Sequence, residues 1–335
     1  MSTPMDFDDA ALDELLGAYA LDALDLDEQA AVERYLARTP SAADEVERLR
    51  TAAAWIGASE ALAPPSRLRT TLLDAARGRA LDDTLAGYTT ETARFDAVVD
   101  EVTEDALGRT TANGLGIHHL VIHLAAMESL LAATLGEPVI AGIDETDVDA
   151  RTARFVERFR DRPVDDARAV WRDAVAAVRR WAGDPAHATD DVACFGLVLS
   201  RDSVLLTRAF EIWTHADDIR RELDRPAVHP EPVTLHRMAN MSVTATPIGL
   251  EVIGRAHRGR SARIVLTGPG GGSWLIPLGM SEAAEPADVV VTLDTVDWCL
   301  LVAERVTPDE LVYEATGDES LVPDLAAAAS AFAML

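Results

Sequence analysis

Apolar residues recur at helical spacing in short stretches near the start of the chain. The positions that share a face are Leu12, Leu15, Leu16 and Tyr19 in the first stretch, Ala31, Val32, Tyr35 and Leu36 in the second, and Val46, Leu49, Ala53 and Ile56 in the third. After Pro64-Pro65, the segment from Ser66 to Ala76 predicts a fourth short helix. Helices with so little apolar material are expected to bury a face against a partner.

Longer helical patterns follow, separated by loops rich in glycine and proline. They cover Leu81–Thr103, His118–Leu135, Asp147–Ala182 with a break expected at Pro163, and Ser200–Leu223. Four long helices joined by such loops predict a helix bundle.

The pattern changes after the proline-rich linker at Pro226–Pro232. Helices are predicted over Leu235–Ile253, Thr295–Glu304 and Leu321–Met334, and strands over Ala262–Thr267, Ser273–Pro277, Val289–Leu293 and Tyr313–Thr316. The Gly268–Gly272 segment lacks the Lys-Ser/Thr of a phosphate loop, so it is expected to be a hairpin turn. The predicted class is mainly α, with domains at 1–79, 80–232 and a small α+β domain at 233–335.

Composition restricts the function classes. The chain has 335 residues, 48% of them hydrophobic, and a formal net charge of −27. Such a charge repels nucleic acid and anionic lipid, so neither is an expected partner. The acidic start lacks the features of a signal peptide, no stretch has the roughly 18 unbroken apolar residues of a membrane span, and a cytoplasmic protein is predicted. Cys194 and Cys299 lie too far apart for a CxxC motif.

Two histidine-containing clusters could supply metal ligands. His119 and His123 lie four residues apart, as do Glu211 and His215, and residues at this spacing share a helix face. Two facing bundle helices with such side chains can close a metal site. A His/His/Glu set leaves one position open, which is typical of catalytic zinc, although nickel and other borderline metals accept the same ligands. Alternatively, the histidines are core residues and Glu211 pairs with Arg208.

The chain from about Leu85 onward resembles the mycothiol-dependent maleylpyruvate isomerase family. The resemblance lies in the segments from Leu115 to Leu124 and from Phe210 to Arg220, where Glu-x-x-x-His is followed by Asp218-Ile219. It implies a DinB-like four-helix bundle, and it maps the family's metal ligands onto His123, Glu211 and His215. The C-terminal segment is similar to the family's small α+β domain, which is related to sterol-carrier folds, at Asp297–Leu300 and Thr316–Asp318.

The sequence departs from the family pattern at two positions. The family has tryptophan where this chain has Leu115 and aspartate where it has His119. His119 could therefore add a fourth ligand or replace one, which would close the open position. Asp218 could orient a ligand or could form a salt bridge with Arg220 or Arg221. The resemblance implies mycothiol as a cofactor, bound through its sulfur to one divalent metal ion, with zinc expected.

The N-terminal segment resembles the anti-sigma domains that bind extracytoplasmic-function sigma factors. The likeness covers Glu14–Asp25, Asp27–Leu36 and Ala63–Arg69. Many such domains carry a His-x-x-x-Cys-x-x-Cys zinc motif, and the matching positions here are Tyr35, Thr39 and Ala42. The resemblance therefore implies a zinc-free anti-sigma domain.

These observations lead to two hypotheses. The first is a soluble anti-sigma regulator that binds a sigma factor through its N-terminal helices and senses a thiol or other small ligand at the metal site. The alternative is a mycothiol-dependent metalloenzyme, either an isomerase or a thiol transferase. A metalloprotein that has lost both activities is a third reading.

Overall fold

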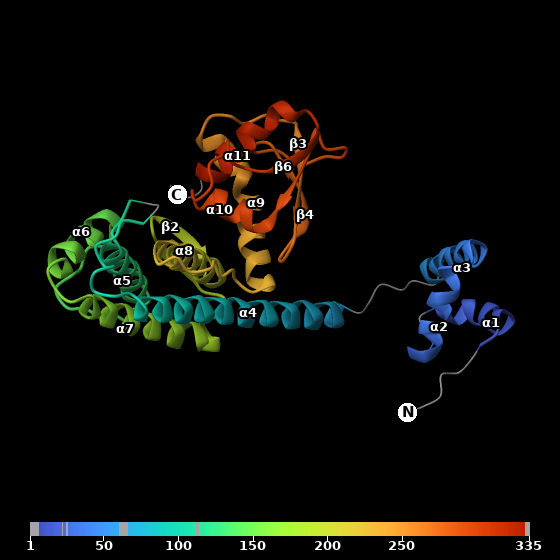
Figure 1. Ribbon diagram of the computed structural model, residues 1–335, viewed down its shortest axis with the longest axis horizontal. Helices are drawn as coiled ribbons and strands as arrows, with labels where there is room; N and C mark the ends of the chain where they lie inside the picture. The colour runs from blue at the N-terminus through green and yellow to red at the C-terminus, as the bar shows by residue number, and fades with distance from the viewer. Residues whose placement is uncertain (1–6, 22, 25, 60–65, 112–113, 332–335) are drawn as a thin grey trace. The chain divides into compact units, whose positions relative to one another are not determined.

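The computed structural model describes residues 7–21, 23–24, 26–59, 66–111 and 114–331. The protein is mainly α-helical, as predicted, with a small C-terminal sheet (Figure 1). It divides into two compact units, Met1–Asp74 and Ala75–Leu335, which are described separately. The Asp25 position and the Ala63-Pro64-Pro65 stretch of the anti-sigma resemblance lie outside the described residues.

The first unit contains α1 (Asp9–Ala20), α2 (Leu26–Leu36) and α3 (Pro40–Ser59). The Asp8 side chain caps α1 by accepting from the backbone N–H of Ala11. The predicted apolar faces pack on one another and form a separate small core that includes Leu12, Val32 and Val46. These described helices therefore bury their apolar faces within the unit, where the sequence suggested burial against a partner.

Helix α4 runs without a break from Ser66 to Asp100. The sequence predicted a short helix at Ser66–Ala76 and a second one beginning at Leu81, and this division is wrong. No proline falls between Ser66 and Asp100, and the two internal glycines weaken a helix without ending it. The boundary between the two units therefore falls inside one helix.

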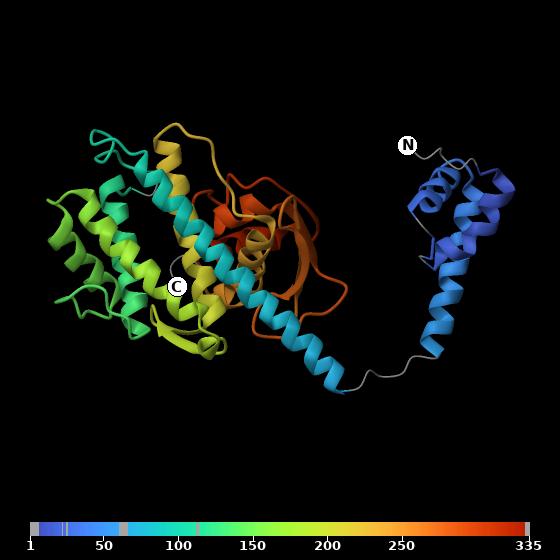
Figure 2. The same ribbon diagram turned by 90° about the horizontal axis from the view of Figure 1, so that it is seen from below.

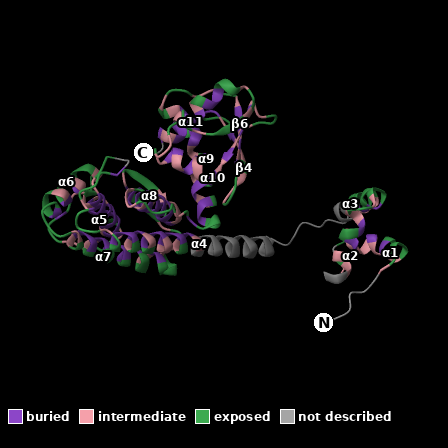
Figure 3. Ribbon diagram, viewed as in Figure 1, coloured by how far each residue is buried: buried purple, intermediate pink, exposed green. Residues whose placement is uncertain are grey.

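The bundle is completed by α5 (Ile117–Thr134), α6 (Val148–Phe159), α7 (Val164–Gly183) and α8 (Arg201–Glu222). Pro163 separates α6 from α7, as predicted. Helix α5 is the central element, since most of its residues are buried and it packs against α6 and α7 (Figure 3). It is long and apolar enough to cross a membrane by composition, but 72% of it is buried inside the protein, as expected for a core helix.

A short hairpin precedes α8 and was not predicted from the sequence. Its strands, β1 (Asp191–Cys194) and β2 (Leu197–Ser200), pair antiparallel. Phe195 in the turn has a φ of 57°, in the left-handed region that non-glycine residues rarely occupy. Strands of four residues are too short to show a clear alternation in the sequence.

The C-terminal region begins with α9 (Pro232–Val252), followed by a four-stranded sheet. Its strands are β3 (Ser261–Thr267), β4 (Gly272–Pro277), β5 (Val289–Asp294) and β6 (Tyr313–Gly317), in the order β4-β3-β5-β6, with β3 and β5 parallel. Helices α9, α10 (Thr295–Val302) and α11 (Val322–Ser330) gather on one face (Figures 1 and 2).

The glycine-rich segment between β3 and β4 is a hairpin turn, as predicted. A Cβ atom at Gly271 would lie 2.4 Å from the carbonyl oxygen of Leu266, so the turn has no room for a side chain there. Helix α9 packs against α8 and brings the sheet domain beside the bundle. Arg305, three residues after α10, contacts His215 and Asp218 on α8.

Candidate metal centre

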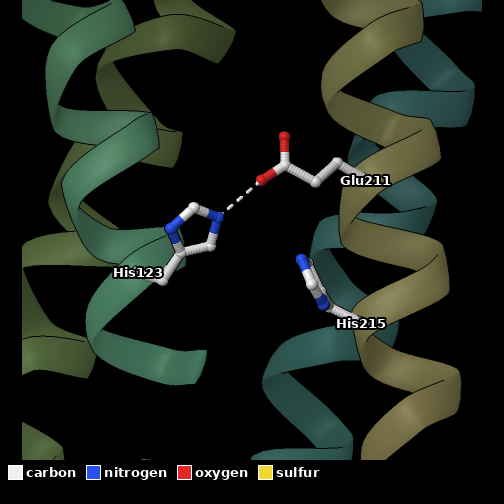
Figure 4. Close-up of side chains that lie close together, drawn as sticks. All are labelled: His123, Glu211 and His215. Carbon is white, nitrogen blue, oxygen red and sulfur yellow. Dashed lines mark hydrogen bonds and ion pairs between the residues drawn. The ribbon is translucent and has the colours of Figure 1, made fainter. Parts of the chain in front are cut away.

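Helices α5 and α8 bring the three predicted ligands together. His123 comes from α5, and Glu211 and His215 come from one face of α8 (Figure 4). One potential ligand atom from each side chain lies within 4.8 Å of the other two. His123 Nε2 is 3.0 Å from Glu211 Oε1. Within the described part of the chain, this is the one group of three His, Cys, Asp or Glu side chains with metal-binding geometry.

The surroundings favour the metal-binding forms of these groups. Burial lowers the pKa of His215 and so keeps its imidazole neutral. Burial opposes ionisation of Glu211, but Arg208 and His123 outweigh it and hold the pKa of this carboxyl well below its usual range. The side chains of His123 and Glu211 remain 24% and 28% exposed, so the cluster is accessible from solvent. The donor set therefore fits a divalent metal ion with a remaining open position.

The orientation of His215 is fixed by Asp218. His215 Nδ1 lies 3.3 Å from Asp218 Oδ2, while the other side of the ring faces His123 and Glu211 (Figure 4). An Nδ1–H that donates to Asp218 leaves Nε2 free to bind a metal. Asp218 is buried and its carboxylate contacts His215 and Arg305, so of the two roles considered for it, orienting a ligand matches its contacts.

Arg305, just after α10, holds Asp218 in turn. Its Nη2 donates to Asp218 Oδ2 at 2.6 Å and its Nε to Oδ1 at 3.2 Å, a bidentate pair. The same Nη2 lies 3.2 Å from His215 Nδ1, but the shorter contact to the carboxylate is the stronger one. The sheet domain thus contributes to the orientation of a bundle ligand.

Comparison with known proteins bears on this arrangement. Residues 88–220 match the family model described as the mycothiol maleylpyruvate isomerase N-terminal domain. This segment belongs to that family. It contains His123, Glu211 and His215, together with the helices that carry them. A search of curated proteins gave no match.

Solved structures show a related fold. A structure titled as the H52A mutant of mycothiol-dependent maleylpyruvate isomerase aligns with a TM-score of 0.50 at 18% identity, covering 70% of this chain and 92% of that one. A second structure, titled as the enzyme without that change, gives a TM-score of 0.49 at 17% identity with the same coverage. At such low identity, the first alignment shows a shared fold and nothing finer.

His119 is not brought into the cluster. It lies in the first turn of α5, is exposed, and stacks beside His118 with 6.5 Å between the ring centroids. Although His119 and His123 share the spacing of one helix face, the ligand group contains only His123. His119 therefore contributes no ligand atom to this group, and the open position stays a prediction.

Sequence reasoning found one of the arginines that contact the candidate ligands and missed the other. Arg208 pairs with Glu211, as the alternative reading suggested, yet this pair coexists with the ligand cluster. Arg305 could not have been found, because no local pattern connects it to Asp218, 87 residues earlier in the chain. The two cysteines are buried, and burial raises the pKa of both thiols, so neither is a reactive thiolate.

We expect one Zn²⁺ ion to bind per chain. The changes His123→Ala, Glu211→Gln and His215→Ala should each weaken binding by more than the roughly 10- to 100-fold typical of changes to outer contacts. Competition with a chromophoric zinc chelator measures these affinities. His119→Ala is the matched control and should bind as the wild type does. An equal loss in His119→Ala would contradict the assignment of ligands.

Proposed function

We propose that the bundle and the sheet domain form a metal-dependent protein that acts with a low-molecular-weight thiol, as an isomerase or a thiol transferase. The observation that carries this proposal is the convergence of His123, Glu211 and His215 with one side open to solvent. The family match over these residues supports it, as does the name of the solved structure that shares the fold, a mycothiol-dependent maleylpyruvate isomerase. Mycothiol is the thiol we propose, and zinc the metal.

Each residue at the metal site would have a separate role. His123, Glu211 and His215 would hold the ion, which when bound lowers the pKa of a coordinated thiol and so supplies a thiolate near neutral pH. Asp218 would keep His215 in the tautomer whose Nε2 faces the site. Arg208 would bind Oε2 of Glu211, so that Oε1 stays directed toward His123.

Thiol binding can be tested without knowing the substrate. Zinc-loaded protein should bind reduced mycothiol in a calorimetric titration and release a proton, so the heat should vary with the ionisation enthalpy of the buffer. Mycothiol disulfide has no thiol to ionise and should not bind in this way.

Glu211→Gln should lose the proton release, and His119→Ala should keep it. Isomerisation of maleylpyruvate that depends on both zinc and mycothiol would then identify the reaction class. Equal binding of the thiol and its disulfide, without proton release, would refute a role for the sulfur.

A second function is proposed for the N-terminal unit, namely binding of a sigma factor. The observation in its favour is that Met1–Asp74 forms a compact unit outside the family match, with its own core. The resemblance to zinc-free anti-sigma domains supplies the partner class. In this reading, the metal domain would sense a small ligand and bias that interaction.

The partner is tested by comparing the full chain with a version that begins at Ser66, which keeps α4 whole. Both are purified from the native cytoplasm, and the proteins that accompany each are identified. A sigma factor retained by the full chain alone is the expected result. If neither version retains a sigma factor, the anti-sigma proposal is wrong, while the metal and thiol proposal is unaffected.

A further inference from the structure

A chain of buried polar contacts leads from α4 to the ligand Glu211. The Tyr88 hydroxyl on α4 donates to Glu128 Oε2 on α5 at 2.8 Å. Arg208 on α8 donates from Nε to Glu128 Oε1 at 2.7 Å and from Nη1 to Glu211 Oε2. Glu211 Oε1 then faces His123 Nε2. Tyr88, Glu128 and Arg208 are all essentially inaccessible to solvent.

The contacts settle which oxygen of Glu211 is available. Arg208 engages Oε2, so Oε1 is the oxygen directed at His123 and the shared ligand space. The guanidinium is itself held in place by Glu128 and by the ring of Phe195. The central carbon of the guanidinium lies 5.3 Å from the centroid of that ring. Arg208 is thereby prevented from turning away from Glu211.

Charge gives Glu128 a second effect on the site. The charges of Arg208 and Glu211 alone sum to zero, so this pair by itself offers a divalent cation no net negative charge. The Glu128 carboxylate, which pairs with Arg208, brings the sum of the three charges to −1. Because Glu128 and Arg208 are shielded from water, this added charge is weakly screened and favours a cation.

Tyr88 keeps Glu128 in this role. Burial, reinforced by the neighbouring Glu128 carboxylate, raises the pKa of Tyr88 well above its ordinary value, so the phenol stays protonated and donates. Both Glu128 oxygens then have a partner, one from α4 and one from α8. Without the hydroxyl, one oxygen of a fully buried carboxylate would lose its donor.

We propose that Tyr88 and Glu128 are positioning residues for Glu211, acting through Arg208, and that metal binding is therefore coupled to the packing of α4 on the bundle. This inference rests on the proposed metal site and adds a regulatory input to it. Helix α4 is the segment that continues into the N-terminal unit, since the boundary at Asp74 lies within it. By linkage, whatever loosens α4 should weaken metal binding, and metal should tighten α4.

The test compares Tyr88→Phe and Glu128→Gln with the wild type and with Tyr35→Phe. Tyr35 is the matched control, because it is a buried tyrosine that donates to the carboxylate of Asp13 at 2.7 Å in the other unit. Full-length proteins are used, and zinc affinity is measured by chelator competition. Hydrogen exchange of the α4 amides is followed with and without zinc.

Tyr88→Phe and Glu128→Gln should each lower zinc affinity by about 10-fold or more, and Tyr35→Phe should leave it unchanged. Zinc should slow exchange in the part of α4 around Tyr88 in the wild type and in Tyr35→Phe, but much less in Tyr88→Phe. A purely structural role would lower the melting temperature without altering zinc affinity or the zinc-dependent exchange.

Two results would overturn the inference, and they are distinguishable. Tyr88→Phe that binds zinc as the wild type does, with the same protection of α4, refutes the coupling and leaves the metal site intact. A wild-type protein that binds no zinc refutes the proposed function and this inference with it. If Tyr88→Phe does not fold, Glu128→Gln decides between these outcomes, because it retains the tyrosine and the shape of the carboxyl side chain.

Discussion

The contact between Glu211 on α8 and His123 on α5 is the constraint on which the site depends. Neither helix carries a complete ligand set, so the centre exists only where their faces meet. Packing within the rest of the bundle keeps these two helix faces in contact. Helix α5 is the buried centre of the bundle and contacts α6 and α7, which limits its freedom to shift relative to α8. A displacement of either helix by about 1 Å would change the distances between the ligand atoms by more than metal coordination tolerates.

Charge has to be balanced around this contact. A buried guanidinium that loses its carboxylate partner costs about 3–5 kcal/mol, so Arg208 requires both Glu128 and Glu211. The pairing also keeps Glu211 ionised, which a metal ligand must be. On the other side of the site, Asp218 and Arg305 form a comparable buried pair beside His215. Glu211 is thus oriented by the Arg208–Glu128 pair, and His215 by the Asp218–Arg305 pair. In each pair one residue lies outside α8.

The sequence indicated which side chains come together at the candidate site better than it indicated the residues that surround them. Spacing along a helix is local information, and it placed Glu211 and His215 on one face together with a candidate on α5. Spacing alone did not distinguish His119 from His123; the family resemblance pointed to His123, and the structure groups His123 with Glu211 and His215. Arg305 depends on a contact between distant elements and has no local signal. The family likeness from Leu85 onward was confirmed over residues 88–220, whereas the sigma-factor partner stays a prediction.

The fold shows the same division between local and long-range information. The long helices, the break at Pro163 and the sheet strands follow from periodicity and proline positions, and the structure contains them. The predicted break before Leu81 was wrong because α4 is continuous, and the hairpin before α8 was missed because its strands are very short. Both features matter for function, since α4 carries Tyr88 and the hairpin turn places Phe195 over Arg208.

X-ray absorption at the zinc edge of the zinc-loaded protein, without and with reduced mycothiol, tests the central claim most directly. The account predicts nitrogen and oxygen ligands alone in the absence of thiol, with two imidazoles at about 2.0–2.1 Å and one carboxylate oxygen. Added mycothiol should introduce a single sulfur at about 2.3 Å. A zinc spectrum without imidazole scattering, or one that the Glu211→Gln change leaves unaltered, would contradict the assignment of His123, Glu211 and His215 as the metal centre.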